Sequence, residues 1–412
     1  MNRQRLLGSL EKRFWLLDRA AATHIVMAAE IEGAGPEHAW QDALLAAQAR
    51  HPLLRVCITV NDDGEPEFTP YGDRTIPFHV LNLSSDHDLS DFMASELSTP
   101  FDLAGKPLAR AALLRDAQRS FLILCAHHAI ADGMSMAFVV RDLVKASAGR
   151  LIDPLHMPQS IDVLAGFRPH RFSTDRRPAE REVDDIVDSG DRGGVLPVVE
   201  RSRFTTAFTR MLRDRCRKEN TTVHGALCAA FAKAGHDIHE DWRASAARVV
   251  SPVNARGVVG VQDDLGLYIS SKLLELEPAA DSDFWSLARF ARQGLINESS
   301  RERVTALTAG LRTLLATCDL RTATRKLSEG RARDLMLTNI GQIPFECDFG
   351  AVRISAVWGP LALSGYPGEY TVGIATTHGA LSITTATRRP TRGLLDTAKD
   401  ILNSAVIGKE SP

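Results

Sequence analysis

The chain has 412 residues, of which 44% are hydrophobic and 24% charged, and its formal net charge is -2. At this length two domains of about 200 residues each are expected, since a single core rarely grows so large. The near-neutral charge gives no reason to expect nucleic acid or an anionic membrane as a partner. No stretch approaches the roughly 18 uninterrupted apolar residues of a membrane-spanning helix, so no membrane span is expected.

The amino terminus and the cysteines bear on localisation. Charged side chains interrupt the first 13 residues before any apolar run reaches signal-peptide length, so we expect no secretion signal. The six cysteines are widely spaced and contain no C-x-x-C pair. This spacing favours reduced thiols that act as small core residues in the cytoplasm, rather than a zinc site or a redox dithiol.

The first part of the chain alternates helical and strand patterns. We expect a helix within residues 6–17, a strand at 24–30, a helix from Pro36 to near Arg50, a strand at 53–60 and a helix within 84–98. Strands at 111–115 and 121–126 are expected to pair as a hairpin across the turn at 116–119. Because residues 121–126 are all apolar or small, their strand is expected to be buried on both faces.

Between residues 154 and 197 the pattern changes. This segment holds five prolines and little apolar periodicity, which is typical of a linker. We therefore expect an N-terminal lobe at 1–165, a linker at 166–200 and a C-terminal lobe at 201–412.

Regular periodicity returns in the C-terminal lobe. Helices are expected at 205–216, 222–231, 284–295, 304–317 and 394–406, and strands at 248–253, 266–274, 335–338, 352–357, 371–377 and 381–387.

The polar cluster of interest follows the buried strand at 121–126. His127 and His128 end that strand, Asp132 and Gly133 follow in a turn, and a helical pattern begins after Gly133. Neighbouring strand residues point to opposite sides, so one histidine is expected to face a cleft and the other the protein interior. A neutral imidazole, with an ordinary pKa of about 6.5, can take a proton from a nucleophile and return it to a leaving group. A lone histidine at a strand end is more often structural, but this combination favours acyl transfer.

Two other chemistries fit the same stretch less well. Cys125 stands two residues before His127, but no third group is evident that would orient a thiol nucleophile, so a core cysteine is favoured. His127, His128 and Asp132 are possible metal ligands, yet no further histidine or carboxylate cluster supplies the rest of a zinc site. No metal is therefore expected.

Residues 127–133 read H-H-A-I-A-D-G and match the H-H-x-x-x-D-G signature of the CoA-dependent acyltransferase superfamily, which includes condensation domains of nonribosomal peptide synthetases. Stretches that resemble further landmarks follow in family order over nearly the whole chain, at 51–55, 100–103, 107–110, 254–256, 266–270 and 338–341. The chain most resembles the free-standing polyketide-associated and alcohol O-acyltransferases. The Asp-Phe-Gly at 348–350 shares only three letters with the D-F-G-W-G of relatives, and we assign it no role.

This resemblance implies a fold and a set of site residues. The implied fold is α/β (α+β), with two chloramphenicol-acetyltransferase-like lobes that meet in a V around a channel. His128 would be the general base, and Asp132 would form a structural ion pair with Arg256. His127 and Gly133 would support the site. Within the substrate channel, Ser135 would lie near the thioester, and Asn339 and Gly341 would line the side of the second lobe. A strand-end turn residue is an equally good interpretation of Asn339, since asparagine is favoured in turns.

The implied activity is transfer of an acyl group from a CoA or carrier-protein thioester to a hydroxyl acceptor, which forms an ester in secondary metabolite or lipid biosynthesis. No cofactor is expected, because CoA or phosphopantetheine serves as a substrate handle. The expected partners are acyl-CoA or an acyl carrier protein and a small hydroxyl acceptor. Two alternatives stay open: a free-standing condensation enzyme that forms an amide, and a catalytically inactive relative that binds a carrier protein.

Overall fold

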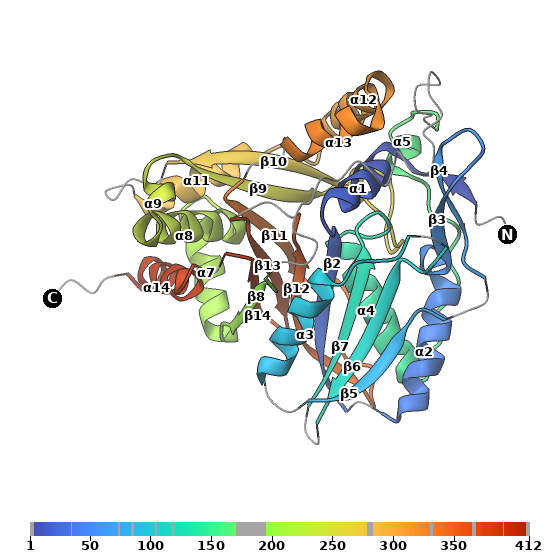
Figure 1. The fold of residues 1–412 in the computed structure, drawn as a ribbon. Helices are drawn as coiled ribbons and strands as arrows, with labels where there is room; N and C mark the ends of the chain where they lie inside the picture. The colour runs from blue at the N-terminus through green and yellow to red at the C-terminus, as the bar shows by residue number, and fades with distance from the viewer. Residues whose placement is uncertain are drawn as a thin grey trace.

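Two large sheets and the helices around them make up most of the structure (Figure 1). The computed structural model describes residues 4–408, except residues 34, 73–74, 84–85, 104, 117–118, 170–194, 278–282, 330–332, 365–367 and 390. Helices and strands alternate through the chain, so the expected α/β fold class is confirmed. Among the helices of this described part, none combines the length and the apolar character needed to cross a membrane.

The first sheet carries the histidine strand at its centre. Its strand order is β12-β2-β7-β6-β5. The strands are β12 (Arg353–Ala362), β2 (His24–Glu32), β7 (Ser120–His127), β6 (Ala109–Arg115) and β5 (Phe78–Asn82). Every residue of β7 is buried, and β6 pairs with β7 antiparallel. Both the doubly buried strand and its hairpin partner are therefore confirmed.

The two faces of β7 explain why its sequence is apolar throughout. Leu122 and Leu124 belong to a core shared with α2 (Glu37–Arg50) and α4 (Gly133–Ser147). Phe121 and Ile123 belong to a second core, shared with α3 (Asp86–Ser98). Because alternate side chains of a strand point to opposite faces, a strand covered on both sides needs an apolar residue at every position.

The second sheet has the strand order β10-β9-β11-β13-β14-β8. Its strands are β10 (Ile269–Leu276), β9 (Ala247–Asn254), β11 (Leu335–Gln342), β13 (Tyr370–Thr377), β14 (Ala380–Thr387) and β8 (Val198–Arg203). Four helices share one apolar core with this sheet: α7 (Thr206–Lys218), α8 (Val223–Ile238), α11 (Phe284–Gly294) and α14 (Leu394–Ile407). In α7, α11 and α14 the buried residues recur every three to four positions, so one face is buried and the other lies in water. Helix α8 is buried along most of its length, because α11 and α14 pack against it.

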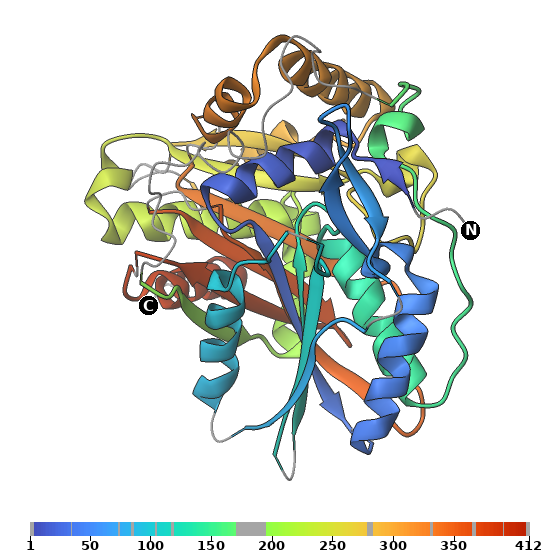
Figure 2. The same cartoon turned by 45° about the vertical axis from the view of Figure 1, so that its right-hand side comes forward.

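Several elements lie between or beside the sheets. Helix α1 (Ser9–Ala20) contacts α12 (Arg301–Thr317) and α13 (Leu320–Glu329), which lie at the top of Figure 1, and Figure 2 shows α1 beneath them. A small sheet is formed by β1 (Arg5–Leu6), β4 (Pro66–Pro70) and β3 (Val56–Val60). The remaining short helices are η1 (Pro52–Arg55), α5 (Ile161–Leu164), α9 (Glu240–Arg243) and α10 (Arg256–Val259).

Strand β12 joins the two halves of the chain. It comes late in the sequence, yet it pairs antiparallel with β2 of the first sheet. It also packs against the second sheet: the amide of Gly359 donates to Oγ1 of Thr384 at 2.9 Å, and a Cβ added at Gly373 would lie 2.1 Å from the carbonyl oxygen of Pro360. The C-terminal half therefore contributes a strand to the N-terminal sheet.

A few local expectations differ from the structure. Residues 53–55 form the 3-10 helix η1 instead of the start of a strand, because Pro52 pre-sets a helical turn directly after α2 ends. Eight elements of the described chain were not expected from the pattern: β1, β4, β5, α5, β8, α9, α10 and α13. Most of the expected linker at 166–200 lies outside the described residues. All six cysteines are free thiols, and five of them are buried, as expected for core residues.

The tight contact at Gly373 gives a stability prediction. Gly373→Ala must push β13 away from the backbone of β12, and we expect it to lower the free energy of unfolding by about 1 to 3 kcal/mol. Gly310→Ala is the matched control, because Gly310 is a helical residue of α12 with no atom near the added Cβ. The control should be neutral or stabilising by up to about 1 kcal/mol. Thermal or urea unfolding measures both, and equal effects would contradict the proposed contact.

Candidate active site

His128 lies just past the end of β7, where a turn leads to α4. Its amide donates to the carbonyl oxygen of Thr23 at 3.0 Å, and the amide of His127 donates to the carbonyl oxygen of Leu108 at 2.8 Å. His127 is fully buried, whereas His128 is partly exposed and lines two cavities. The two histidines thus point to different environments, as strand alternation predicts.

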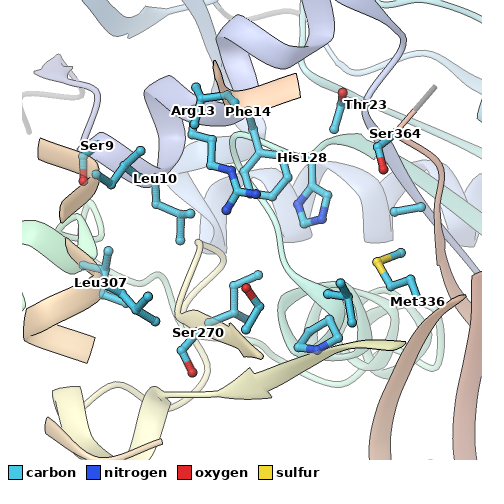
Figure 3. A pocket seen from close by; sticks show the side chains of 18 of the residues that line it. Ser9, Leu10, Arg13, Phe14, Thr23, His128, Ser270, Leu307, Met336 and Ser364 are labelled. Atoms are coloured by element: carbon cyan, nitrogen blue, oxygen red, sulfur yellow. The ribbon is translucent and has the colours of Figure 1, made fainter. Parts of the chain in front are cut away.

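The imidazole of His128 is held in an apolar setting. It stacks on the ring of Phe14 from α1, with ring centres 3.9 Å apart and planes 17° from parallel, and Figure 3 shows the two rings side by side. Burial lowers the pKa of His128 to about 4, although the carbonyl groups of His128 and Ala131 and the charge of Asp132 oppose this shift. The ring is therefore neutral at pH 7 and able to accept a proton.

His127 belongs to a separate buried group with Asp18 and His24. Its Nδ1 accepts a hydrogen bond from the amide of Ala129 at 3.0 Å, which leaves the ring proton on Nε2, 3.5 Å from the Asp18 carboxylate. His24 lies 3.4 Å from the same carboxylate. Burial alone would raise the pKa of Asp18, but the two imidazoles outweigh it and hold that pKa below its usual range. His127 therefore supports the turn from inside the protein.

Asp132 and Arg256 form a buried ion pair across the two halves of the chain. The Nη1 of Arg256 donates to Oδ2 of Asp132 at 2.7 Å, and both side chains are almost inaccessible to water. The same carboxylate accepts from the amide of Tyr268 at 2.9 Å, and through Oδ1 it accepts from the amide of Ser135 at 2.8 Å. The last bond makes Asp132 the N-cap of α4. Asp132 thus fixes both the turn and the helix that follow His128.

Ser135 lies within this hydrogen-bond network. Its hydroxyl donates to the carbonyl oxygen of Gly266 at 2.6 Å and accepts from the Gly266 amide at 2.9 Å and from Nη2 of Arg256 at 2.7 Å. One donor and two acceptor positions are all that a hydroxyl has, so none is left for a substrate. Ser135 is fully buried and lines neither cavity described below, and its expected place beside the thioester stays a prediction.

The two cavities meet at His128. The larger, which we call the α1 cavity, has a volume of about 260 Å³ and includes Leu10, Arg13, Phe14 and Leu307 in its lining. The smaller, which we call the α4 cavity, has a volume of about 90 Å³ and includes Gly133, Asn254, Asn339 and Pro360. Five residues line both: His128, Pro252, Ile269, Met336 and Ala362. These come from both halves of the chain, so the cavities lie between them.

The α4 cavity is lined by four of the expected site residues: His128, Asp132, Gly133 and Asn339. A Cβ at Gly133 would lie 2.8 Å from the Pro360 ring, so a glycine is needed where β12 passes the start of α4. Asn339 lines the cavity, and its Oδ1 accepts from the amide of Gly341 at 2.8 Å. Asn339 therefore both lines the cavity and stabilises a turn, which are the two roles that the sequence left open. Gly341 has a φ of 73° at a bulge in β11 and lines neither cavity, so it shapes the loop.

The sequence analysis did not indicate that residues of α1 belong to the site. Phe14 and Arg13 stand more than 100 positions before His128, in a segment recognised only as a helix. Their spacing from Leu10 and Leu17 marks one helix face, but it gives no sign that a cavity lies on that face. The alternative of a thiol nucleophile is not supported, because burial raises the pKa of Cys125 far above its ordinary value.

Comparison with known proteins agrees with this geometry. The family model for the condensation domain matches residues 9–159. Cyclosporin synthetase simA from Tolypocladium inflatum is 26% identical over 308 residues, which are 68% of this chain but 2% of that protein. This relative and others like it are far longer proteins. The chain spans between 2% and 10% of the length of such curated relatives.

Solved structures resemble the chain over its whole length. Polyketide synthase associated protein 5 from Mycobacterium tuberculosis is 18% identical, with a TM-score of 0.68 and coverage of 99% of this chain and 98% of that one. TRI3 trichothecene 15-O-acetyltransferase from Fusarium sporotrichioides is 13% identical, with a TM-score of 0.64 and coverage of 98% and 95%. These structures confirm the expected fold, and the condensation-domain match over residues 9–159 is consistent with the expected superfamily.

The buried ion pair gives a second prediction. Asp132→Asn leaves the Arg256 guanidinium buried without its carboxylate, and we expect the free energy of unfolding to fall by about 3 to 5 kcal/mol. Asp214→Asn is the matched control, because it breaks an exposed pair with Arg217 at 3.1 Å and should cost less than about 1 kcal/mol. Urea unfolding of both variants tests this, and a similar small loss in both would show that the pair is not a structural constraint.

Proposed function

We propose that this chain is an acyltransferase that moves an acyl group from a thioester to an acceptor, with His128 as the general base. The observation that carries the proposal is one neutral, partly exposed imidazole at the junction of two cavities. Two substrates entering from the two cavities would meet at this ring. A general base must lie within hydrogen-bond reach of the nucleophile and be unprotonated at the working pH, and His128 has a suitable position and charge.

The chemical step needs a single proton carrier. Nδ1 of His128 is buried, so Nε2 is the nitrogen left to face the cavities. As the acceptor oxygen attacks the thioester carbon, Nε2 takes its proton, and a carbon-oxygen bond forms. The tetrahedral intermediate then collapses, the carbon-sulfur bond breaks, and the same proton passes from Nε2 to the departing sulfur. The chain's own residues need only hold the ring neutral and both substrates beside it.

The thioester would be carried by CoA or by the phosphopantetheine of a carrier protein, and no further cofactor takes part in these steps. Ester formation is the preferred product, in secondary metabolite or lipid biosynthesis. It is supported by similarity in fold to a protein described as an O-acetyltransferase and to one described as polyketide synthase associated. Amide formation is the second candidate, and the condensation-domain match over residues 9–159 favours it. The same base serves both reactions, so only the acceptor distinguishes them.

Replacement of His128 tests the proposal directly. We expect His128→Ala to lower the transfer rate by a factor of about 100 to 10,000, because general-base catalysis commonly contributes that much, and to leave the chain folded. Intact-mass analysis of transfer from CoA and carrier thioesters to mixed alcohol and amine acceptors measures the rate and identifies the product. His38→Ala, on the exposed surface of α2, is the control and should be fully active. Full activity of His128→Ala would exclude this residue as the base.

The pH dependence of transfer provides an independent check. Only the neutral ring accepts a proton, and a lowered pKa keeps it neutral to lower pH, so kcat/KM should stay level from pH 8 down to about 5 and be halved near pH 4. An unperturbed histidine would halve it at about pH 6.5. The unfolded state binds more protons between these two values, so stability falls as pH falls through this window, and circular dichroism must accompany each rate. A midpoint near 6.5 would contradict the apolar setting of His128.

A further inference from the structure

The α1 cavity is apolar over most of its wall and includes two arginine side chains, Arg13 and Arg333. Leu10, Leu307, Leu311 and Leu327 contribute aliphatic side chains from α1, α12 and α13. Arg13 extends from α1 beside Phe14, and its guanidinium points into the same space as the His128 ring (Figure 3). The guanidinium carbon lies 5.8 Å from the centre of the Phe14 ring, which in turn stacks on His128. A group bound to Arg13 would therefore lie one aromatic ring away from the base.

Arg13 has no counterion among the described residues. Its Nε is buried and has no hydrogen-bond partner, and no carboxylate in the described part of the chain forms an ion pair with it. The other arginine in the lining, Arg333, is already neutralised, since its Nη2 lies 3.0 Å from the Glu369 carboxylate and also contacts Ser364. The charge that remains uncompensated in this cavity is thus that of Arg13.

A second unsatisfied polar group lies on the same helix face. The hydroxyl of Ser9, four residues before Arg13, lines the α1 cavity, is fully buried and has no hydrogen-bond partner. Residues four apart on a helix project from the same side, so Ser9 and Arg13 both face the cavity. Native proteins rarely leave buried polar groups unpaired, and such groups in a cavity next to a base indicate a ligand that pairs with them.

Charge and geometry define the chemistry of that ligand. An uncompensated guanidinium in an apolar cavity is unfavourable, and burial, together with repulsion from Arg333, lowers the pKa of Arg13 to about 10. At that value the group still keeps its proton at pH 7, so only an anion can compensate it. The planar fork of a guanidinium matches a carboxylate, which can accept two parallel hydrogen bonds.

We infer that the acceptor of the proposed transfer is a hydroxy acid, whose carboxylate pairs with Arg13 while its apolar body fills the α1 cavity and its hydroxyl reaches His128. This inference rests on the proposed function. A thioester donor is held from outside by the large carrier to which it is attached. A free acceptor has no such tether and needs an anchor within the cavity to fix its orientation.

Binding in the absence of any donor tests the inference without turnover. The probes are 3-hydroxyoctanoate and its uncharged methyl ester, titrated calorimetrically into the wild-type protein and into Arg13→Gln. We expect Arg13→Gln to weaken binding of the acid at least about tenfold, because a charge-assisted pair is lost, and to change binding of the ester less than about twofold. Arg13→Lys keeps the charge but loses the fork, and should fall between the two.

The controls separate anion recognition from a structural role. Arg217→Gln removes an exposed arginine on α7 and should bind both probes like the wild type. Arg13→Gln should unfold at the same or a higher temperature, since it removes an unpaired charge, whereas a structural arginine would lower that temperature. In steady-state assays, the KM for the acid should rise at least about tenfold with little change in kcat.

Several outcomes would overturn the inference. Equal loss of affinity for acid and ester in Arg13→Gln would show that Arg13 only shapes the cavity, and equal affinity of the wild type for both would exclude carboxylate recognition. Tighter binding of octyl phosphate than of 3-hydroxyoctanoate would assign the site to a phosphate instead. Because these measurements need no catalysis, absence of transfer with every thioester would refute the proposed function separately.

Discussion

The ion pair between Asp132 and Arg256 joins two stretches that are 124 positions apart in the chain. Its geometry leaves little freedom, because the carboxylate also caps α4 and accepts from the amide of Tyr268, while the guanidinium also donates to the hydroxyl of Ser135. The turn after β7 cannot move relative to β9 and α10 without leaving buried charges unpaired, which is costly. The position of His128 between the two halves of the chain depends on this constraint.

Four charged or ionisable groups near the site compensate the free-energy cost of burial in three different ways. Asp132 and Arg256 satisfy it by pairing with each other. His128 has no such partner and loses its proton, and the resulting neutral ring is the form that a general base requires. Arg13 lacks a described partner and cannot give up its proton at neutral pH, so its charge is left for a ligand. Desolvation thus underlies the structural ion pair, the neutral form of the proposed base and the charge at the inferred ligand site, all within one region.

Strand β12 makes the two halves one structure at the site. It completes the first sheet beside β2, packs its backbone against Gly373 of the second sheet, and contributes Pro360 and Ala362 to the cavity walls. The glycines at positions 133 and 373 are both explained by this strand, since each lies where a Cβ would meet residue 360. The shape of the space around His128 is therefore set by backbone contact as much as by side chains.

Residue order was sufficient to predict most of the longer elements and the residues of the turn. The apolar run at 121–126 identifies a strand buried on both faces, and the seven residues from His127 to Gly133 indicate the proposed base and its structural support, because both signals are local. Such local patterns do not predict the surroundings of Ser135, Arg13 and Phe14. Their roles depend on which segments lie beside them: Gly266 and Arg256 occupy the hydroxyl of Ser135, and α12 and α13 enclose the face of α1 that carries Arg13. Packing between distant segments decides those neighbours, and no periodicity in a single segment encodes it.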